Sequence, residues 1–583
     1  MCGIICVVSR PSARPLPLAA DILDALDRAI AAGTAGNIAE SGRLVAEADA
    51  SLRGESGLGT LIDNIALVSG LVSRVDQLDG LASGAEAQLE SESGLSTREV
   101  ERRSNELIAL RDATWSLRND RLRTAKAVGE LAGKDASASA RNAYLSIQQA
   151  FSALDRMEVR GRDSAGVHVL VWGHGLEVTD KRVAPLLAGR LDDTLFTNGS
   201  VRVGAGSRAW SFVYKAAAEI GELGDNTRAM RTTVSNDALL RLLISQPNAR
   251  VSILGHTRWA SVGIISEPNA HPVNSEEVGG NAAAPYMLAA LNGDVDNHAD
   301  IKVRNGLHIA EPITTDAKVI PTVVARKNAA GMPFVDAFRE TVAEFEGSVA
   351  IAVASADEPN SMMLALRGSG QGLYVGIAED RFIVASEPYG VVEETLHYVR
   401  MDGESLADTN NPSSRGQVIA LDGDNAGSLA GMRMLAYDGT SIPLVDSTVS
   451  IAEVTTRDID RGEHKHFLSK EIAEAPLSFR KTLRGKISER NGQLEATLDT
   501  TVLPDDIRAK LTAGTFTRIR VIGQGTAAIA GRSLAQLLRT MVDHRVQVDA
   551  LPATELSGFQ LQLDMTDTLI IAISQSGTTT DTN

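Results

Sequence analysis

The amino-acid composition changes sharply after the first few residues, and this change limits the folds that the chain can adopt. Residues Cys2 to Val8 form a β-rich run that stops at Pro11, whereas residues 16–147 are rich in Ala, Leu, Glu and Arg. Short β-rich runs separated by Gly-, Asn- and Asp-rich turns then continue toward residue 440. We interpret residues 16–145 as a helical insertion, and residues 1–15 and 146–440 as the two parts of one α+β domain.

Within the expected insertion, apolar residues recur at alternating steps of three and four, which is typical of one helix face. These residues are Leu58, Leu61, Ile65, Val68, Val72 and Val75. A second, charged helical run covers roughly residues 97–131. We interpret the block as long paired helices packed on each other. A coiled coil that dimerises the chain or binds a partner is the alternative.

The rest of the α+β domain alternates between short strands and turns. A helical stretch near Asn236–Ile244 makes residues 176–250 look like a second, mostly helical insertion. The acidic, Gly-, Asp- and Ser-rich region that follows residue 403 predicts a linker at 441–465. The clearest strands are expected at Gly166–Val171, Val251–Leu254, Ser348–Ala354 and Arg381–Ala385.

A different pattern begins near residue 466. A helix at Ser469–Leu483 precedes a strand at Arg518–Ile522, a helix at Ala527–Met541 and a strand at Thr568–Ile573. Such alternation predicts a parallel sheet covered by helices. Because two parallel strands do not make a stable domain, we expect residues 466–583 to be part of a larger one.

Bulk properties exclude some classes of protein. A length of 583 residues exceeds one ordinary core, so two or more domains are expected. The net charge of −17 argues against a nucleic-acid partner. Runs of about 18 apolar residues do not occur, so no membrane span is expected. The two cysteines, Cys2 and Cys6, lie too far apart on an extended strand to form a disulfide. Free thiols indicate a reducing, cytoplasmic setting.

Cys2 is a candidate nucleophile because its position gives it two functional groups. Removal of Met1 would leave one residue carrying both a thiol and a free α-amine. That amine has a reference pKa of about 7.7–8.0, so it can accept the thiol proton near neutral pH. This is the N-terminal variant of an activated nucleophile. Taken alone, Cys2 is better explained as a small buried residue in a first strand.

Five ordered motifs favour the catalytic interpretation. Together with Met1-Cys2-Gly3-Ile4 they resemble class II glutamine amidotransferases of the N-terminal-nucleophile type, and within that class the glutamine–fructose-6-phosphate aminotransferases. The resemblance implies a four-layer αββα N-terminal-nucleophile hydrolase fold that hydrolyses glutamine through a thioester on Cys2. The motifs are Arg160-Gly161-Arg162-Asp163-Ser164-Ala165-Gly166, Gly255-His256-Thr257-Arg258-Trp259-Ala260-Ser261, Asn269-Ala270-His271-Pro272, Leu291-Asn292-Gly293-Asp294 and Thr314-Thr315-Asp316.

The resemblance also implies roles for single residues. Amide hydrolysis needs donors for an oxyanion, and the family's oxyanion hole maps onto the Asn292 side chain and the Gly293 backbone N–H. The carboxylate of glutamine needs a bidentate cation, which Arg258 can supply. The α-ammonium needs an anion, which the match assigns to Asp316. Ser261 stands where the family usually has a Thr that contacts the substrate.

Three further positions need comment. Trp259 matches a residue that gates ammonia passage in the family, although a core aromatic is an equal alternative. Val262 replaces the family's usual His, which is expected to alter the lip of the glutamine pocket. His256 and His271 are expected to be structural rather than catalytic. We expect no cofactor, and no spacing of His, Cys, Asp and Glu indicates a metal site.

The C-terminal part has its own resemblance, to the start of the family's sugar-isomerase (SIS) domain. His466 to Ile472 and Ala475-Pro476 look like the hinge that leads into it. Two strand-to-helix turns, Gly523-Gln524-Gly525-Thr526 and Ser574 to Thr579, offer hydroxyls and backbone N–H groups suited to a phosphate. Ala527 replaces a Ser that normally contacts the phosphate. The positions that match the family's sugar-phosphate ligands are Thr526, Ser574, Gln575, Ser576 and Thr579.

These resemblances imply that ammonia passes from glutamine to a ketose phosphate, most simply fructose 6-phosphate, to give glucosamine 6-phosphate. Ala527 and the insertions leave open an amidotransferase with another acceptor. A regulatory or scaffolding homologue whose long helices carry the function is the alternative of a different class. Glutamine and a sugar phosphate are the expected ligands, and a homo-oligomer is expected. A separate or missing C-terminal SIS segment is a further possibility.

Overall fold

The computed structural model describes residues 2–582 except 93–94, 135, 205–208, 218–221, 281–284, 485, 491, 497–499, 501–502 and 575–581. The chain divides into two compact units. The first consists of Met1–Gly94 and Glu101–Ile472, and the second of Leu95–Val100 and Ala473–Asn583. Each unit is considered by itself below.

A nine-stranded antiparallel sheet has the first strand of the chain near its centre. All seven residues of β1 (Gly3–Ser9) are buried, and β1 pairs with β11 (Arg381–Ala385) on one side and β5 (Arg250–Arg258) on the other. Burial on both faces explains why this run is almost continuously apolar. From one edge to the other, the strands are β16 (Val449–Ile451), β12 (His397–Arg400), β10 (Tyr374–Ile377), β11, β1, β5, β2 (Ser164–Trp172), β4 (Ala209–Ala217) and β3 (Val201–Val203).

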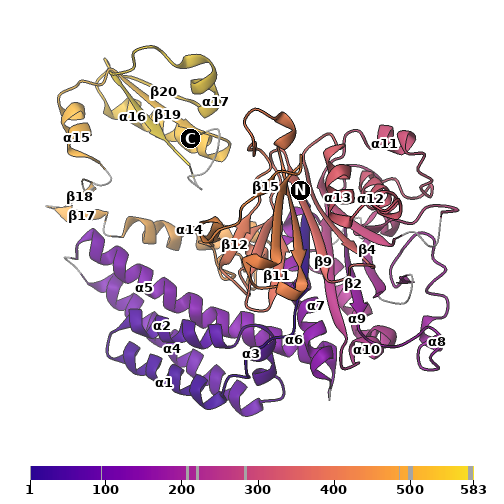
Figure 1. Cartoon of the computed structure of the whole chain (residues 1–583). Helices are drawn as coiled ribbons and strands as arrows, with labels where there is room; N and C mark the ends of the chain where they lie inside the picture. Colours follow the sequence, from indigo (N-terminus) through magenta and orange to yellow (C-terminus); the bar gives the residue numbers. More distant parts are fainter. Residues whose placement is uncertain are drawn as a thin grey trace. The chain divides into compact units, whose positions relative to one another are not determined.

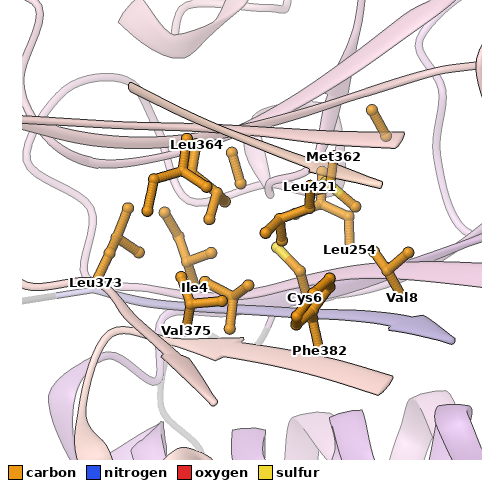
Figure 2. Packing of buried hydrophobic residues seen from close by; sticks show 14 of the residues in the cluster. Ile4, Cys6, Val8, Leu254, Met362, Leu364, Leu373, Val375, Phe382 and Leu421 are labelled. Carbon is orange, nitrogen blue, oxygen red and sulfur yellow. The ribbon is translucent and has the colours of Figure 1, made fainter. Parts of the chain in front are cut away.

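A second, seven-stranded sheet lies against the first. Ile4, Cys6 and Val8 point from β1 into the space between the sheets, where they meet side chains such as Leu364 and Leu421 from the second sheet (Figure 2). This buried layer is the central core of the unit. In order, the second sheet contains β15 (Ser441–Ile442), β14 (Met432–Ala436), β13 (Gln417–Asp422), β9 (Ser361–Arg367), β8 (Val349–Ser355), β7 (Met287–Gly293) and β6 (Val273–Asn274).

Helices cover the outer faces of both sheets. Helix α7 (Ala138–Met157) packs on β1 and β5, whereas α12 (Val319–Ala329) and α13 (Phe334–Ala343) share a second apolar cluster with β7, β8 and β9. The short helix α11 (His298–Arg304) contributes Ile301 to the same cluster. The expected αββα order of layers is therefore present.

The residues between β1 and α7 fold as helices that run side by side (Figure 1). The predicted apolar face was partly wrong: Ile65 is 80% exposed, whereas Leu67, Leu71 and Leu78 are buried. The three-and-four pattern of apolar residues crosses a helix boundary at residues 62–64, where the helix axis changes direction by 101°. The elements are α1 (Ala19–Thr34), α2 (Ile38–Ser51), α3 (Gly54–Leu61), α4 (Ile65–Ser91), α5 (Thr97–Trp115), a π-helical turn at Ser116–Leu122 and α6 (Arg123–Ala132).

Two predicted segment assignments need correction. Residues 176–250 are not a helical insertion, because β4 pairs with β2 along nine residues and β3 forms the sheet edge. The helices here, α8 (Ala184–Leu187), α9 (Asp225–Asn236) and α10 (Ala238–Ile244), are short. Residues 441–465 are not simply a linker, because β15 and β16 lie at the edges of the two sheets. Short strands at sheet edges carry little apolar patterning, which is why the sequence conceals them.

The second unit contains a parallel sheet of three strands rather than the two that were predicted. Strand β19 (Arg518–Gly523) lies between β20 (Gln547–Pro552) and β21 (Thr568–Ala572). The polar residues and terminal proline of β20 explain why it was missed. Other elements of the chain's last part are α14 (Phe467–Leu483), β17 (Ile487–Arg490), β18 (Gln493–Ala496), α15 (Asp505–Thr512), α16 (Thr526–Met541) and α17 (Ala553–Glu555).

Among the described residues, no single helix has the length and apolar character needed to cross a bilayer. The sharply bent pair α3–α4 meets the criterion only when its two helices are counted together, by length and composition alone.

A buried ionic cluster holds the helical insertion on the sheets. The Arg121 guanidinium, which comes from the π-helical turn, lies 3.1 Å from Asp49 Oδ1 and 3.0 Å from Glu394 Oε1. It also donates to the Glu393 carbonyl. The three charged side chains are each only 2% exposed. Arg121 thus joins α2 to the segment between β11 and β12.

We predict that Arg121→Ala strongly destabilises the first unit, because it leaves Glu394 buried without its cation and leaves Asp49 with Arg53 alone. Breaking a buried pair typically costs about 3–5 kcal/mol. The matched control is Arg43→Ala, which removes a half-exposed arginine that pairs with Glu40 on the same helix α2. Exposed pairs contribute about 0–1 kcal/mol. Urea unfolding of both variants provides the measurement, and equal losses of stability would contradict the proposed anchor.

Candidate active site

The pairing of β1 with β5 places Cys2 beside Arg258 and Trp259. Gly3 is opposite Thr257 in this antiparallel register, so Cys2 lies where β5 ends. The Trp259 backbone N–H donates to Cys2 Sγ over 3.2 Å, and the Trp259 carbonyl lies 3.4 Å from the same sulfur. Burial is the main cause that raises the pKa of the Cys2 thiol, while the Trp259 N–H opposes it. The thiol is therefore predominantly protonated at neutral pH and needs a base.

Asn292 lies at the end of β7, on the sheet that faces Cys2's own. Its side chain is fully buried and donates to Ser386 Oγ over 2.7 Å. Ser386 Oγ in turn accepts the Ile4 backbone N–H over 2.8 Å. The nitrogen of Asn292 carries two hydrogens, so one remains after the bond to Ser386. Ser386 was not predicted from the sequence, because a single Ser after a strand carries no motif.

Gly293 has a backbone conformation that other residues rarely adopt. Its φ is +84°, and a Cβ built there would lie 1.9 Å from the Ser348 carbonyl oxygen. Such a contact is incompatible with a side chain. Glycine is therefore required at this position, next to the Asn292 amide.

The loop after β5 folds back over Arg258. The Arg258 guanidinium donates to the carbonyls of Val262 and Ile264, the latter over 3.3 Å, and the residue is 2% exposed. Trp259 is 59% exposed, so its interpretation as a core aromatic is wrong. Asp163 Oδ2 accepts the Ala260 N–H over 2.8 Å, which connects the loop to the first of the five motifs.

Asp316, the final residue of the last motif, begins a single 3₁₀ turn. Its carboxylate accepts the backbone N–H groups of Val295 over 2.8 Å and Ala317 over 3.0 Å. Burial raises the pKa of this carboxyl, and the Val295 N–H opposes that shift. These two bonds fix the orientation of the Asp316 side chain. One of them comes from Val295, on the segment that directly follows Asn292 and Gly293.

Asp294 is a site residue whose role the sequence did not reveal. Ser261 Oγ donates to Asp294 Oδ1 over 2.5 Å, which ties the loop after β5 to the end of β7. The negative charge of Asp294 also raises the pKa values of both Cys2 and Asp316, although less than burial does. The sequence signal that points to Asp294 is its position directly after Gly293, within the motif Leu291-Asn292-Gly293-Asp294.

His256 and His271 are buried and neutral. Burial lowers the pKa of His256 to about 3 and that of His271 well below its usual value. His256 Nε2 lies 2.9 Å from the Leu291 carbonyl and 3.1 Å from Asn292 Oδ1. His271 Nε2 lies 3.0 Å from Thr315 Oγ1. Both rings therefore position the ends of neighbouring motifs.

The predicted phosphate-facing residues of the second unit are only partly described. Thr526 begins α16 and is exposed, and Gly525 has a φ of +58°. Ser574 follows β21, and Ile573 N–H donates to the Ile522 carbonyl over 2.8 Å, so the chain enters both predicted turns from neighbouring positions. Ala527 lies in the first turn of α16. Gln575, Ser576 and Thr579 lie outside the described residues.

The described part of the chain contains no group of three or more His, Cys, Asp or Glu side chains that could hold a metal ion. Cys2 and Cys6 are both free thiols.

Comparison with curated proteins identifies relatives of this chain. No family model matches the chain. It is similar to glutamine–fructose-6-phosphate aminotransferase (isomerizing) from Geobacillus kaustophilus, with 29% identity over 344 residues that cover 59% of this chain and 50% of the relative. The enzymes of that name from Bacillus subtilis and Caulobacter vibrioides are 30% and 26% identical, over 56% and 63% of this chain and 48% and 54% of theirs. The chain thus spans about half the length of the curated relatives it matches.

Two solved structures also resemble the chain. One is glutamine phosphoribosylpyrophosphate amidotransferase from B. subtilis with ADP and GMP, at 17% identity and a TM-score of 0.31 over 50% of this chain and 47% of that one. The other, described as the allosteric regulatory enzyme of purine biosynthesis, has a TM-score of 0.32 at 17% identity, over 50% and 46%. The sequence relatives confirm the resemblance drawn from the motifs: the chain is similar to the class II glutamine amidotransferases named glutamine–fructose-6-phosphate aminotransferase.

Proposed function

We propose that the chain hydrolyses glutamine with Cys2 as the nucleophile. The observation that carries the proposal is the contact between Cys2 Sγ and the Trp259 N–H at 3.2 Å, beside the buried Arg258. The first strand and the five motifs, which are distant in sequence, supply one nucleophile, two candidate oxyanion donors and two charged groups. These are the parts that hydrolysis of an amino-acid carboxamide requires.

In the proposed reaction, the α-amine of Cys2, freed by removal of Met1, accepts the thiol proton. The thiolate attacks the carboxamide carbon of glutamine, and the resulting oxyanion is stabilised by the second Asn292 Nδ2 hydrogen and the Gly293 N–H. Ammonia leaves with the transferred proton, and water hydrolyses the thioester to glutamate. Such a thiol must stay reduced, as a cytoplasmic compartment would keep it.

Arg258 and Asp316 would bind the head group of glutamine. The Arg258 guanidinium now donates to two carbonyls of its own loop. A bidentate carboxylate would give stronger, charge-assisted bonds than these neutral acceptors. Asp316, oriented by two backbone N–H groups, would accept from the α-ammonium. Trp259 and Ser261 lie on the same loop and would enclose the substrate as the loop adjusts.

We further propose that ammonia passes to a ketose phosphate, with fructose 6-phosphate as the first candidate. The names of the relatives, and the hydrogen bond that brings Ile573 beside Ile522 at the start of the Gly523–Thr526 turn, support this acceptor. We assign that unit to a sugar-isomerase (SIS) domain and expect a homo-oligomer. Ala527 keeps a different acceptor as the second candidate. A scaffolding role for α1–α6 would apply if glutamine were not hydrolysed at all.

Amide-¹⁵N-glutamine tests both steps together. We expect the full chain to form glutamate, and Cys2→Ala to lose this activity. Cys6→Ala is the matched control, because Cys6 is buried in the core between the sheets. Mass spectrometry after addition of fructose 6-phosphate identifies where the label goes. Labelled glucosamine 6-phosphate would support the acceptor, whereas transfer of the label to another sugar phosphate in preference to fructose 6-phosphate would reject it. Full activity in Cys2→Ala would overturn the nucleophile itself.

Substitutions of Asn292 and Arg258 should affect different kinetic parameters. Asn292→Ala removes a donor that acts only in the transition state, so kcat should fall by roughly 10²–10³. Arg258→Lys keeps the charge but loses the bidentate fork, so its main effect should be a higher KM for glutamine. Steady-state glutaminase assays at matched folding, checked by circular dichroism, provide the comparison. Changes in the same parameter for both variants would show that the roles are misassigned.

Asp294→Asn should make the thiol more acidic. Its carboxylate raises the pKa of Cys2, so an uncharged amide should move the midpoint of thiolate formation to lower pH. The rate of Cys2 alkylation by iodoacetamide, followed by intact mass against pH, reports this midpoint. Asp296→Asn, at an exposed carboxylate two residues further on, is the control. A midpoint that is unchanged, or moved to higher pH, in Asp294→Asn would contradict the inferred effect of the Asp294 charge on the pKa of Cys2.

A further inference from the structure

A cavity of about 560 Å³ lies in the first unit, and its lining contains none of the residues assigned to the glutamine site. Its walls come from α6, α7 and α9, which pack against one another (Figure 1), and from the segment 456–467. The volume falls within the range of about 300–1,000 Å³ that is usual for small-molecule sites. The helical insertion, the layer helix α7 and the segment that precedes the second unit therefore share one cavity.

The lining of this cavity is strongly basic. Two acidic side chains, Asp155 and Asp460, face the same space. The excess of positive charge is local, because the whole chain carries a net charge of −17. The basic side chains are Arg123, Arg156, Arg228, Arg231 and Arg461.

Several of these arginines retain donors for a ligand. Arg156 bonds Glu393 over 2.7 Å through Nη1, but its buried Nε has no hydrogen-bond partner among the described residues. Arg461 donates to the Lys465 carbonyl over 2.6 Å, and within the described chain no acidic side chain lies at ion-pair distance from it. The Arg461 guanidinium therefore keeps N–H groups that the oxygens of an anion in the cavity can accept.

Part of the lining is apolar. Leu223, Ile459 and Phe467 line the cavity together with the arginines. Guanidinium groups bind phosphate oxygens in pairs of parallel hydrogen bonds, and an aromatic or aliphatic wall suits an organic group attached to the phosphate. We propose that this cavity binds a phosphate ester of metabolite size. The bound ester would join α6, α7 and α9 to the segment 456–467 and so regulate the chain from outside the glutamine site.

Isothermal titration of the full chain with phenyl phosphate and with inorganic phosphate tests the proposal. We expect saturable binding of both, with phenyl phosphate the tighter because its ring can contact Phe467. Arg461→Gln and Arg231→Gln should each weaken binding about tenfold or more, as loss of a charge-assisted pair does. Arg433→Gln is the matched control, because it removes an exposed arginine on β14 that is not part of the lining.

Two further variants locate the bound anion. Phe467→Ala should remove the advantage of phenyl phosphate over inorganic phosphate, whereas Thr526→Val, which removes the predicted phosphate contact of the second unit, should leave intact the binding that the arginine substitutions weaken. Absence of saturable binding, or equal binding by the arginine variants and the Arg433→Gln control, would overturn the proposal. So would loss of binding in Thr526→Val alone, which would place the anion at the second unit. Glutamine hydrolysis need not occur for any of these measurements, so the outcome is independent of the proposed reaction.

Discussion

The antiparallel pairing of β1 with β5 is the contact on which the proposed glutamine site depends. It places Cys2 one residue beyond the Gly3–Thr257 pair and so next to Trp259. The same strand presents the Ile4 N–H to Ser386, which holds the Asn292 amide on the facing sheet. Nucleophile and candidate oxyanion donor are therefore positioned by one strand, through backbone pairing at Cys2 and through the Ser386 hydroxyl at Asn292.

The central position of β1 also explains the tolerance for a large insertion directly after it. β1 pairs along both of its edges and is buried on both faces. The chain can then leave the sheet for more than a hundred residues, because the next element of the core, α7, packs back on β1 and β5. Arg121 supplies the opposite constraint, since its buried charge is satisfied only when α2 and the segment after β11 lie together.

Sequence reasoning succeeded where chemistry is encoded in short, ordered motifs. The motifs predicted that Cys2, Arg258 and Asn292 belong together, and strands such as β11 were predicted because apolar residues and turn residues agree there. It failed where contacts between distant segments determine the structure. The break between α3 and α4 lies inside an unbroken three-and-four pattern, and β4 was hidden by the helices that follow it. The effect of Asp294 depends on Ser261 approaching from another segment, which no local pattern specifies.

The exposure of Trp259 has an optical consequence. Of the chain's four tryptophans, Trp210 is fully buried, Trp115 and Trp172 are partly buried, and Trp259 alone is mostly in solvent. Indole emission moves to longer wavelength in water, so the red edge of the intrinsic fluorescence spectrum belongs chiefly to this one residue. Its backbone also contacts the Cys2 sulfur. The chain consequently has a built-in spectroscopic probe at the mouth of its thiol site, and that probe needs no label.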